Sequence, residues 1–129
     1  MKSHTDLEQS KKLAEILPIE SADYYHATDA GVVIIAPYIT YCGEERCVPA
    51  YKGAVPCWSL AALLSLIPQE IFDGEYILNI TEGRDNRWVL TYDHYENRNH
   101  SYYGLSTGAD NLVDACVDII IKLKERNII

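Results

Sequence analysis

The stretch Leu105–Arg126 (LSTGADNLVDACVDIIIKLKER) decides the fold of this chain. It reads as the end of a strand, a capped turn and a long helix. A narrow polar stripe recurs every three to four residues and consists of Asn111, Asp114, Asp118, Lys122 and Glu125. The apolar positions around it are Leu112, Val113, Ala115, Cys116, Val117, Ile119, Ile120, Ile121 and Leu123. Because such a wide apolar arc must be covered on several sides, we expect this helix to lie across a sheet at the centre of the core.

The sequence before this helix predicts one more helix and three strands. The helix is expected to begin at Ser59, a good N-cap, and to end at Pro68. Its apolar face would consist of Leu60, Leu63, Leu64 and Ile67. Alternation of apolar and polar residues predicts strands over 76–81 and 87–92, and aromatic residues predict a third over 101–105. The second half is therefore expected to run α-β-β-β-α.

The first half also has helix and strand signals. Thr5-Asp6-Leu7-Glu8 has the form of a capping box, and Pro18 is expected to end the helix that follows. A hairpin is predicted from 24–26 and 32–36, and a second from 38–42 and 47–51. Together the two halves predict one α+β domain over residues 1–129, with a mostly antiparallel sheet and helices packed on one face.

Composition limits the classes of function. The chain has 129 residues, a formal net charge of −8 and 48% apolar residues, which is typical of a globular protein. It has neither a run of about 20 apolar residues that would span a membrane nor the apolar region of a signal peptide, so we expect a cytoplasmic protein. The negative charge disfavours binding to phosphate backbones.

The order α-β-β-β-α is shared by double-stranded-RNA-binding domains, which place basic side chains at the start of the last helix. Here that start, Gly108-Ala109-Asp110-Asn111-Leu112-Val113-Asp114, carries two carboxylates and no Lys or Arg. Because carboxylates repel phosphates, we expect no double-stranded RNA partner. The same order resembles HicB-like antitoxins, small acidic proteins that neutralise a basic ribonuclease. That resemblance covers about 70 residues and rests on topology.

Three sequence segments resemble segments of uncharacterised small proteins from prophages and mobile elements of gut bacteria. They are Leu13-Ala14-Glu15-Ile16-Leu17-Pro18-Ile19-Glu20-Ser21-Ala22-Asp23, Trp58-Ser59-Leu60-Ala61-Ala62-Leu63-Leu64 and Asp110-Asn111-Leu112-Val113-Asp114-Ala115-Cys116-Val117. The resemblance implies a mobile-element context and no particular activity.

Metal binding is the most specific chemical hypothesis that the residues offer. Cys42-x4-Cys47 and His94-x5-His100 have spacings near those of small zinc sites, with Asp93 and Glu96 as candidates to orient the ligands. The two pairs lie about fifty residues apart, and the histidines would bracket a polar turn. The favoured interpretation is therefore that the chain binds no metal and no cofactor. The alternative is that the chain is a small zinc-binding protein.

Cysteine chemistry offers two further hypotheses. Cys42 and Cys47 could face each other across a hairpin, although a reducing cytoplasm disfavours a disulfide. Cys57 lies just before the second helix, where the helix dipole favours a thiolate, but spacing identifies no partner histidine. Cys116 is expected to be a small buried apolar residue. Because no phosphate-binding loop or nucleophile motif is present either, we expect no enzymatic activity.

Tyrosine is the remaining anomaly, with 10 in the chain. In extended backbone, neighbours such as Tyr24/Tyr25 and Tyr102/Tyr103 point to opposite faces, so one of each pair should be less buried. Exposed tyrosines near an arginine are typical of protein-binding surfaces. The sequence therefore predicts a protein-interaction module whose binding residues are Tyr95, Arg98, Tyr102 and Tyr103.

Overall fold

The structure is a computed structural model that describes residues 2–29, 32–37 and 55–129. The described residues group into two compact units. The N-terminal unit consists of residues 3–62, and the C-terminal unit consists of Lys2 together with residues 63–129. Helices and antiparallel sheets occur in both, so the predicted α+β class is confirmed. The second predicted hairpin, 38–42 with 47–51, lies outside the described residues.

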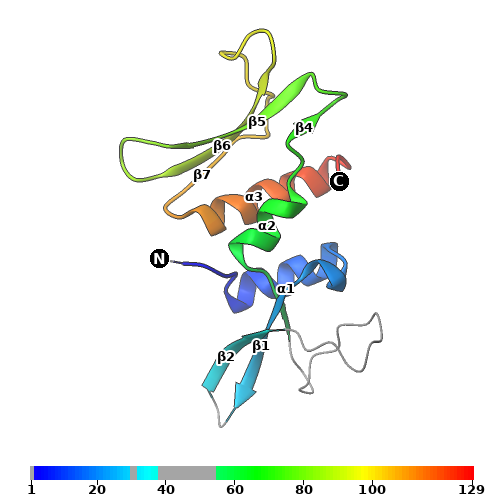
Figure 1. Cartoon of the computed structure of the whole chain (residues 1–129), viewed down its shortest axis with the longest axis vertical. Coiled ribbons are helices and arrows are strands. Elements are labelled where there is room, and N and C mark those ends of the chain that lie inside the picture. Colours follow the sequence, from blue (N-terminus) through cyan, green and yellow to red (C-terminus); the bar gives the residue numbers. More distant parts are fainter. Residues whose placement is uncertain (1, 30–31, 38–54) are drawn as a thin grey trace. The chain divides into compact units, whose positions relative to one another are not determined.

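The N-terminal unit combines a helix with a small sheet (Figure 1). Helix α1 spans Leu7–Ile16 and is followed by a short 3-10 turn, Ile19–Ser21. Strand β1 (Tyr24–Asp29) pairs with both β2 (Val32–Pro37) and β3 (Val55–Cys57), and both pairings are antiparallel. The predicted hairpin of residues 24–26 and 32–36 is thereby confirmed. The third strand, β3, was not predicted.

The cap of α1 differs from the sequence prediction by one residue. The N-cap is Asp6, whose side chain accepts a hydrogen bond from the Gln9 backbone N–H at 2.8 Å. The Gln9 side chain accepts one from the Asp6 backbone N–H at 3.1 Å, which completes a capping box. The predicted box of Thr5 and Glu8 was therefore wrong, because the Thr5 side chain is fully buried in other contacts.

The C-terminal unit contains a four-stranded antiparallel sheet in the order β4-β5-β6-β7. Its strands are β4 (Glu70–Ile71), β5 (Tyr76–Glu82), β6 (Trp88–His94) and β7 (Thr107–Ala109). Helix α2 (Leu60–Leu66) leads into the unit, and Ser59 caps it by accepting from the Ala62 N–H at 3.2 Å. The predicted cap of α2 is confirmed. Of its predicted apolar face, Leu63 and Ile67 are buried, whereas Leu60 and Leu64 are half-buried.

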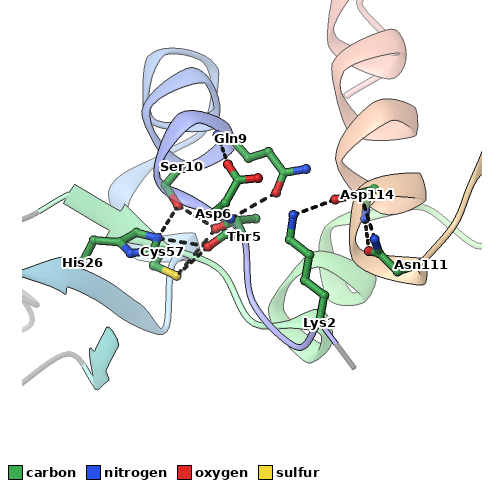
Figure 2. Close-up of polar contacts among 9 residues, drawn as sticks. All are labelled: Lys2, Thr5, Asp6, Gln9, Ser10, His26, Cys57, Asn111 and Asp114. Atoms are coloured by element: carbon green, nitrogen blue, oxygen red, sulfur yellow. Dashed lines mark hydrogen bonds and ion pairs between the residues drawn. The ribbon is translucent and has the colours of Figure 1, made fainter. Parts of the chain in front are cut away.

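Helix α3 (Leu112–Glu125) forms the core of the C-terminal unit, as the sequence predicts, and contacts β6 and β7 (Figure 1). Its buried residues are Val113, Ala115, Cys116, Val117, Ile119, Ile120 and Leu123. Asp118 and Glu125 on the polar stripe are exposed. Asn111 caps the helix through the Asp114 N–H at 2.9 Å, and Lys2 pairs with the Asp114 carboxylate at 2.7 Å (Figure 2).

The predicted strand over 101–105 is not formed as a strand. Ser101 makes one isolated bridge to Asp93, after which Gly104 adopts a φ of +82° that ends extended pairing. The chain returns to the sheet only at β7, where Thr107 pairs with Leu90 and Ala109 with Trp88. Leu105 is nevertheless fully buried, because the turn packs its side chain into the core.

Within the part of the chain that the structure describes, no helix has both the length and the apolar character that a bilayer crossing requires.

Candidate functional site

A chain of aromatic rings runs around one end of the sheet in the C-terminal unit. The Phe72 ring centroid lies 5.1 Å from that of Tyr102, which lies 5.1 Å from Tyr76. Tyr76 continues to His94 at 5.4 Å, and His94 stacks on Tyr95 at 5.0 Å. Edge and offset contacts at these separations are the favoured geometry of aromatic pairs. The loops after β4 and β6 and the segment after Ser101 are therefore tied together by ring contacts.

The outer rings of this cluster are exposed to solvent. Tyr76 in the middle is only 9% exposed, whereas Phe72 is 45%, Tyr95 is 53% and Tyr103 is 91% exposed. Tyr102 is half-buried beside the almost free Tyr103, so the predicted difference within this pair is confirmed. The other pair follows the same rule, since Tyr25 is 2% exposed and Tyr24 is half-buried.

Phe72 has an unusual backbone conformation. Its φ is +54°, and those of Asp73 and Gly74 are +55° and +86°. A bulky residue rarely occupies this left-handed region, and such strain gathers at functional sites. Sequence reasoning missed Phe72 as a site residue. The signal available was the Phe-Asp-Gly sequence, which is typical of a tight turn.

Arg126 adds a cation to the same region. It caps the C-terminal end of α3, and its guanidinium carbon lies 5.7 Å from the centre of the Tyr102 ring. The backbone of Gly104 makes room for it, because a Cβ there would lie 1.9 Å from Arg126 Nη2. We name Phe72, Tyr95, Arg98, Tyr102, Tyr103 and Arg126 the aromatic surface. Four of these six residues were predicted from the sequence; Phe72 and Arg126 were not.

A small pocket adjoins the aromatic surface at Tyr95 and Arg98. It has a volume of about 120 Å³ and is lined by Ile77, Leu78, Asn79, Asp93, His94, Tyr95 and Arg98. Asp93 accepts hydrogen bonds from Ser101 Oγ at 2.7 Å and from Asn79 Nδ2 at 3.1 Å. We name this cavity the Asp93 pocket.

The Asp93 carboxylate is charged at neutral pH. Partial burial acts to raise its pKa, but hydrogen bonds from Ser101, Asn79 and Thr91 and the nearby charge of Arg98 together hold the pKa below its usual value. Within the described residues Asp93 forms no ion pair with a Lys or Arg side chain. A negative charge held by neutral donors therefore lies at the Asp93 pocket.

The predicted metal site is only partly described. The ring centroids of His94 and His100 are 6.5 Å apart, so the turn does bring the two histidines together. His94 Nδ1 accepts from the Glu96 backbone N–H at 3.2 Å, and its Nε2 lies 3.7 Å from a Glu75 carboxylate oxygen. No group of three or more metal-ligating side chains occurs among the described residues. Cys42 and Cys47 lie outside them.

A separate polar cluster is buried in the N-terminal unit around Thr5 (Figure 2). Thr5 Oγ1 lies 2.7 Å from Ser10 Oγ and accepts from the Trp58 backbone N–H at 3.1 Å. His26 Nε2 lies 2.9 Å from the Thr5 carbonyl and 3.0 Å from Ser10 Oγ. Since a carbonyl only accepts, Nε2 donates to it, and among the described residues the buried Nδ1 has no hydrogen-bond partner.

Cys57 also belongs to this cluster, because its thiol and His26 both bind the Thr5 carbonyl. Its thiol donates to the Thr5 carbonyl at 3.5 Å, and Thr5 Oγ1 lies 3.6 Å from Sγ. Burial raises the pKa of the Cys57 thiol, although the contacts with Thr5 and Ser10 act to lower it. Cys116 is fully buried on α3, and burial raises its pKa to about 12. Both environments favour the protonated, unreactive thiol.

We therefore expect slow thiol chemistry at these two positions. In the folded protein at pH 7.5, Cys57 and Cys116 should react with a maleimide far more slowly than after denaturation in urea, because each is 0% exposed. Peptide mass spectrometry of the labelled protein gives the rate at each position. Rapid native-state labelling at Cys57 would contradict this and would support an activated thiol.

Searches of protein-family models, of curated proteins and of solved structures gave no match to this chain.

Proposed function

We propose that this chain is a cytoplasmic, non-enzymatic protein-interaction module of a mobile element, and that it binds its partner through the aromatic surface. The observation that carries the proposal is the exposure of Phe72, Tyr95 and Tyr103. Phe72 and Tyr95 are joined through the rings of Tyr102, Tyr76 and His94, and Tyr103 follows Tyr102 in the chain. Folded proteins leave such adjoining aromatic side chains exposed where they contact another molecule. The mobile-element context rests on the sequence resemblance.

The composition of the surface fits this role. Tyrosine provides a large contact area at a low cost in side-chain entropy. Tyrosine and arginine are both enriched among the residues that contribute most to the binding energy of protein interfaces. Arg126 is already positioned over the Tyr102 ring, which also makes an edge contact with the buried Tyr76. A surface fixed in this way binds with a smaller entropic cost than one that must first be ordered.

Phe72 permits a test that separates binding from folding. Phe72→Gly removes the exposed ring and places glycine at a φ that glycine adopts without strain, so the melting temperature should stay equal or rise. Tyr103→Ala, at a 91% exposed side chain, should also leave stability unchanged. In affinity capture from cells that naturally carry the protein, we expect both variants to lose the partner that the wild type retains.

The control for this experiment is Ile19→Ala. Ile19 is 43% exposed, like Phe72, but belongs to the N-terminal unit. It should retain the partner at the wild-type level. Equal retention by wild type, Phe72→Gly and Tyr103→Ala would refute the proposed surface.

An acidic antitoxin is the second candidate. The net charge of −8 and the second half, in which an antiparallel sheet lies between two helices in the sequence, favour it. This function requires that the chain inhibit a small basic ribonuclease encoded beside its own gene. An RNA-cleavage assay with that neighbour distinguishes it from the general interaction module, since a partner without ribonuclease activity excludes it.

A further inference from the structure

The Asp93 pocket has the chemistry of a receptor for a cation. Its carboxylate is fixed by Ser101 and Asn79, which donate hydrogen bonds but supply no positive charge. Thr91 also donates a hydrogen bond to this carboxylate, so of its roughly four lone-pair positions about one remains. The Asn79 amide donates to Asp93 through Nδ2, so its carbonyl oxygen remains as a second acceptor at the same cavity. At the Asp93 pocket the hydrogen-bond acceptors of Asp93 and Asn79 therefore outnumber the donors that Ser101, Asn79 and Thr91 supply.

The walls of the pocket fit the rest of a basic side chain. Ile77, which is 43% exposed, offers an apolar side chain to the methylene groups of a lysine or arginine. Tyr95, at 53% exposure, offers an aromatic face on which a planar guanidinium stacks. A cavity of about 120 Å³ holds one side-chain head and is too small for a nucleotide-sized cofactor.

We propose that the Asp93 pocket receives one arginine side chain of the protein partner. This inference deepens the proposed function and rests on it, because the pocket shares Tyr95 and Arg98 with the aromatic surface. The partner is then a protein with an exposed basic residue next to the apolar groups that cover the aromatic surface. Charge complementarity supports this class of partner, since the chain carries a net charge of −8.

Arg98 has a defined place in this proposal. It lines the pocket and influences Asp93 electrostatically, yet its side chain is exposed and forms no ion pair among the described residues. The partner's arginine therefore competes with the chain's own guanidinium for the same carboxylate. This competition predicts the sign of the Arg98→Ala effect. If Arg98 competes, Arg98→Ala should strengthen the binding of an external guanidinium. If Arg98 instead made a favourable contact with the ligand, Arg98→Ala would weaken that binding.

The pocket can be tested without the partner. Nα-acetyl-arginine amide is titrated into 15N-labelled full-length protein, with the neutral isostere Nα-acetyl-citrulline amide as the matched ligand. Arginine should shift the backbone amide signals of Asn79, Asp93 and Tyr95, and citrulline should not. Asp93→Asn should weaken arginine binding about tenfold or more, because a charge-assisted hydrogen bond is roughly twice as strong as a neutral one. Arg98→Ala should strengthen it.

A second variant distinguishes a loss of arginine binding from a loss of folding. Asp93→Asn alters a hydrogen-bonded residue, so Tyr95→Leu is measured beside it and should weaken arginine binding with an unchanged amide spectrum elsewhere. No arginine-dependent shift at the three amides, or equal shifts with citrulline, would overturn the proposal. Weaker binding in Arg98→Ala would also overturn it. A third outcome is that arginine binds at the pocket while Phe72→Gly retains the partner fully. That outcome would support the pocket and refute the aromatic surface.

Discussion

Ile120→Ala should lower the free energy of unfolding by about 2–5 kcal/mol. Ile120 is 0% exposed on α3, in the middle of the buried stripe that packs against the sheet of the C-terminal unit. The substitution removes three buried carbon atoms and leaves a cavity that close-packed neighbours fill only in part. Urea denaturation followed by circular dichroism measures the change.

The matched control lies two residues away on the same helix. Asp118→Ala changes an exposed position on the polar stripe and improves helix propensity, so the free energy of unfolding should stay within about 0.5 kcal/mol of wild type. An Ile120→Ala effect as small as that of Asp118→Ala would mean that α3 does not form the core.

Thr5→Val should cost about 1–3 kcal/mol, although valine has nearly the same shape as threonine. The lost hydroxyl is the acceptor for the Trp58 backbone N–H and a hydrogen-bond partner of Ser10. Both groups lie in a buried cluster, so the Trp58 N–H would remain buried without a hydrogen bond. Chemical denaturation of the variant measures this cost.

Thr5→Ser separates the hydroxyl from the methyl group. It keeps every hydrogen bond of Thr5 Oγ1 and removes one buried carbon, which costs about 0.8 kcal/mol. The expected order of stability is therefore wild type, then Thr5→Ser, then Thr5→Val. If Thr5→Ser proved less stable than Thr5→Val, packing of the methyl group and not the polar cluster would determine the stability at this position.

The helices were predictable because their signals are strong and local. The polar stripe of α3 repeats at helical spacing over 14 residues, and Pro18 and Pro68 end the two shorter helical patterns. The cap of α1 shows the limit of such signals. Thr5 and Asp6 are both good cap residues, and the choice between them depends on Ser10 and Trp58, which approach Thr5 only in the folded chain.

The third strand of the second half could not be located from local sequence. Ser101-Tyr102-Tyr103 has the aromatic composition of a strand, whereas Thr107-Gly108-Ala109 has low strand propensity. The segment that pairs with β6 is determined by tertiary structure: Ala109 pairs with Trp88, and Thr107 pairs with Leu90. Gly104, with a φ of +82°, meanwhile turns the tyrosine segment away from a regular strand.

The candidate site was predictable only where alternation determines exposure. Adjacent tyrosines in extended backbone face opposite ways, and this predicted that one of Tyr102 and Tyr103 is less buried, without deciding which. The exposed Phe72 and the Asp93 pocket depend on tertiary structure. Phe72 contacts Tyr102, thirty residues later in the sequence, and Asp93 receives hydrogen bonds from two different segments. From the sequence, Asp93 was predicted only as a candidate to orient metal ligands.

Site-specific photocrosslinking tests the proposed interaction surface most directly. A photoreactive amino acid replaces Tyr103 in one protein and Ile19 in another, and both are irradiated in cells that naturally carry the chain. We expect one discrete crosslinked protein from position 103, its loss when Phe72→Gly is added, and no such product from position 19. The same crosslinked species from both positions, or none from position 103, would contradict a partner bound at the aromatic surface.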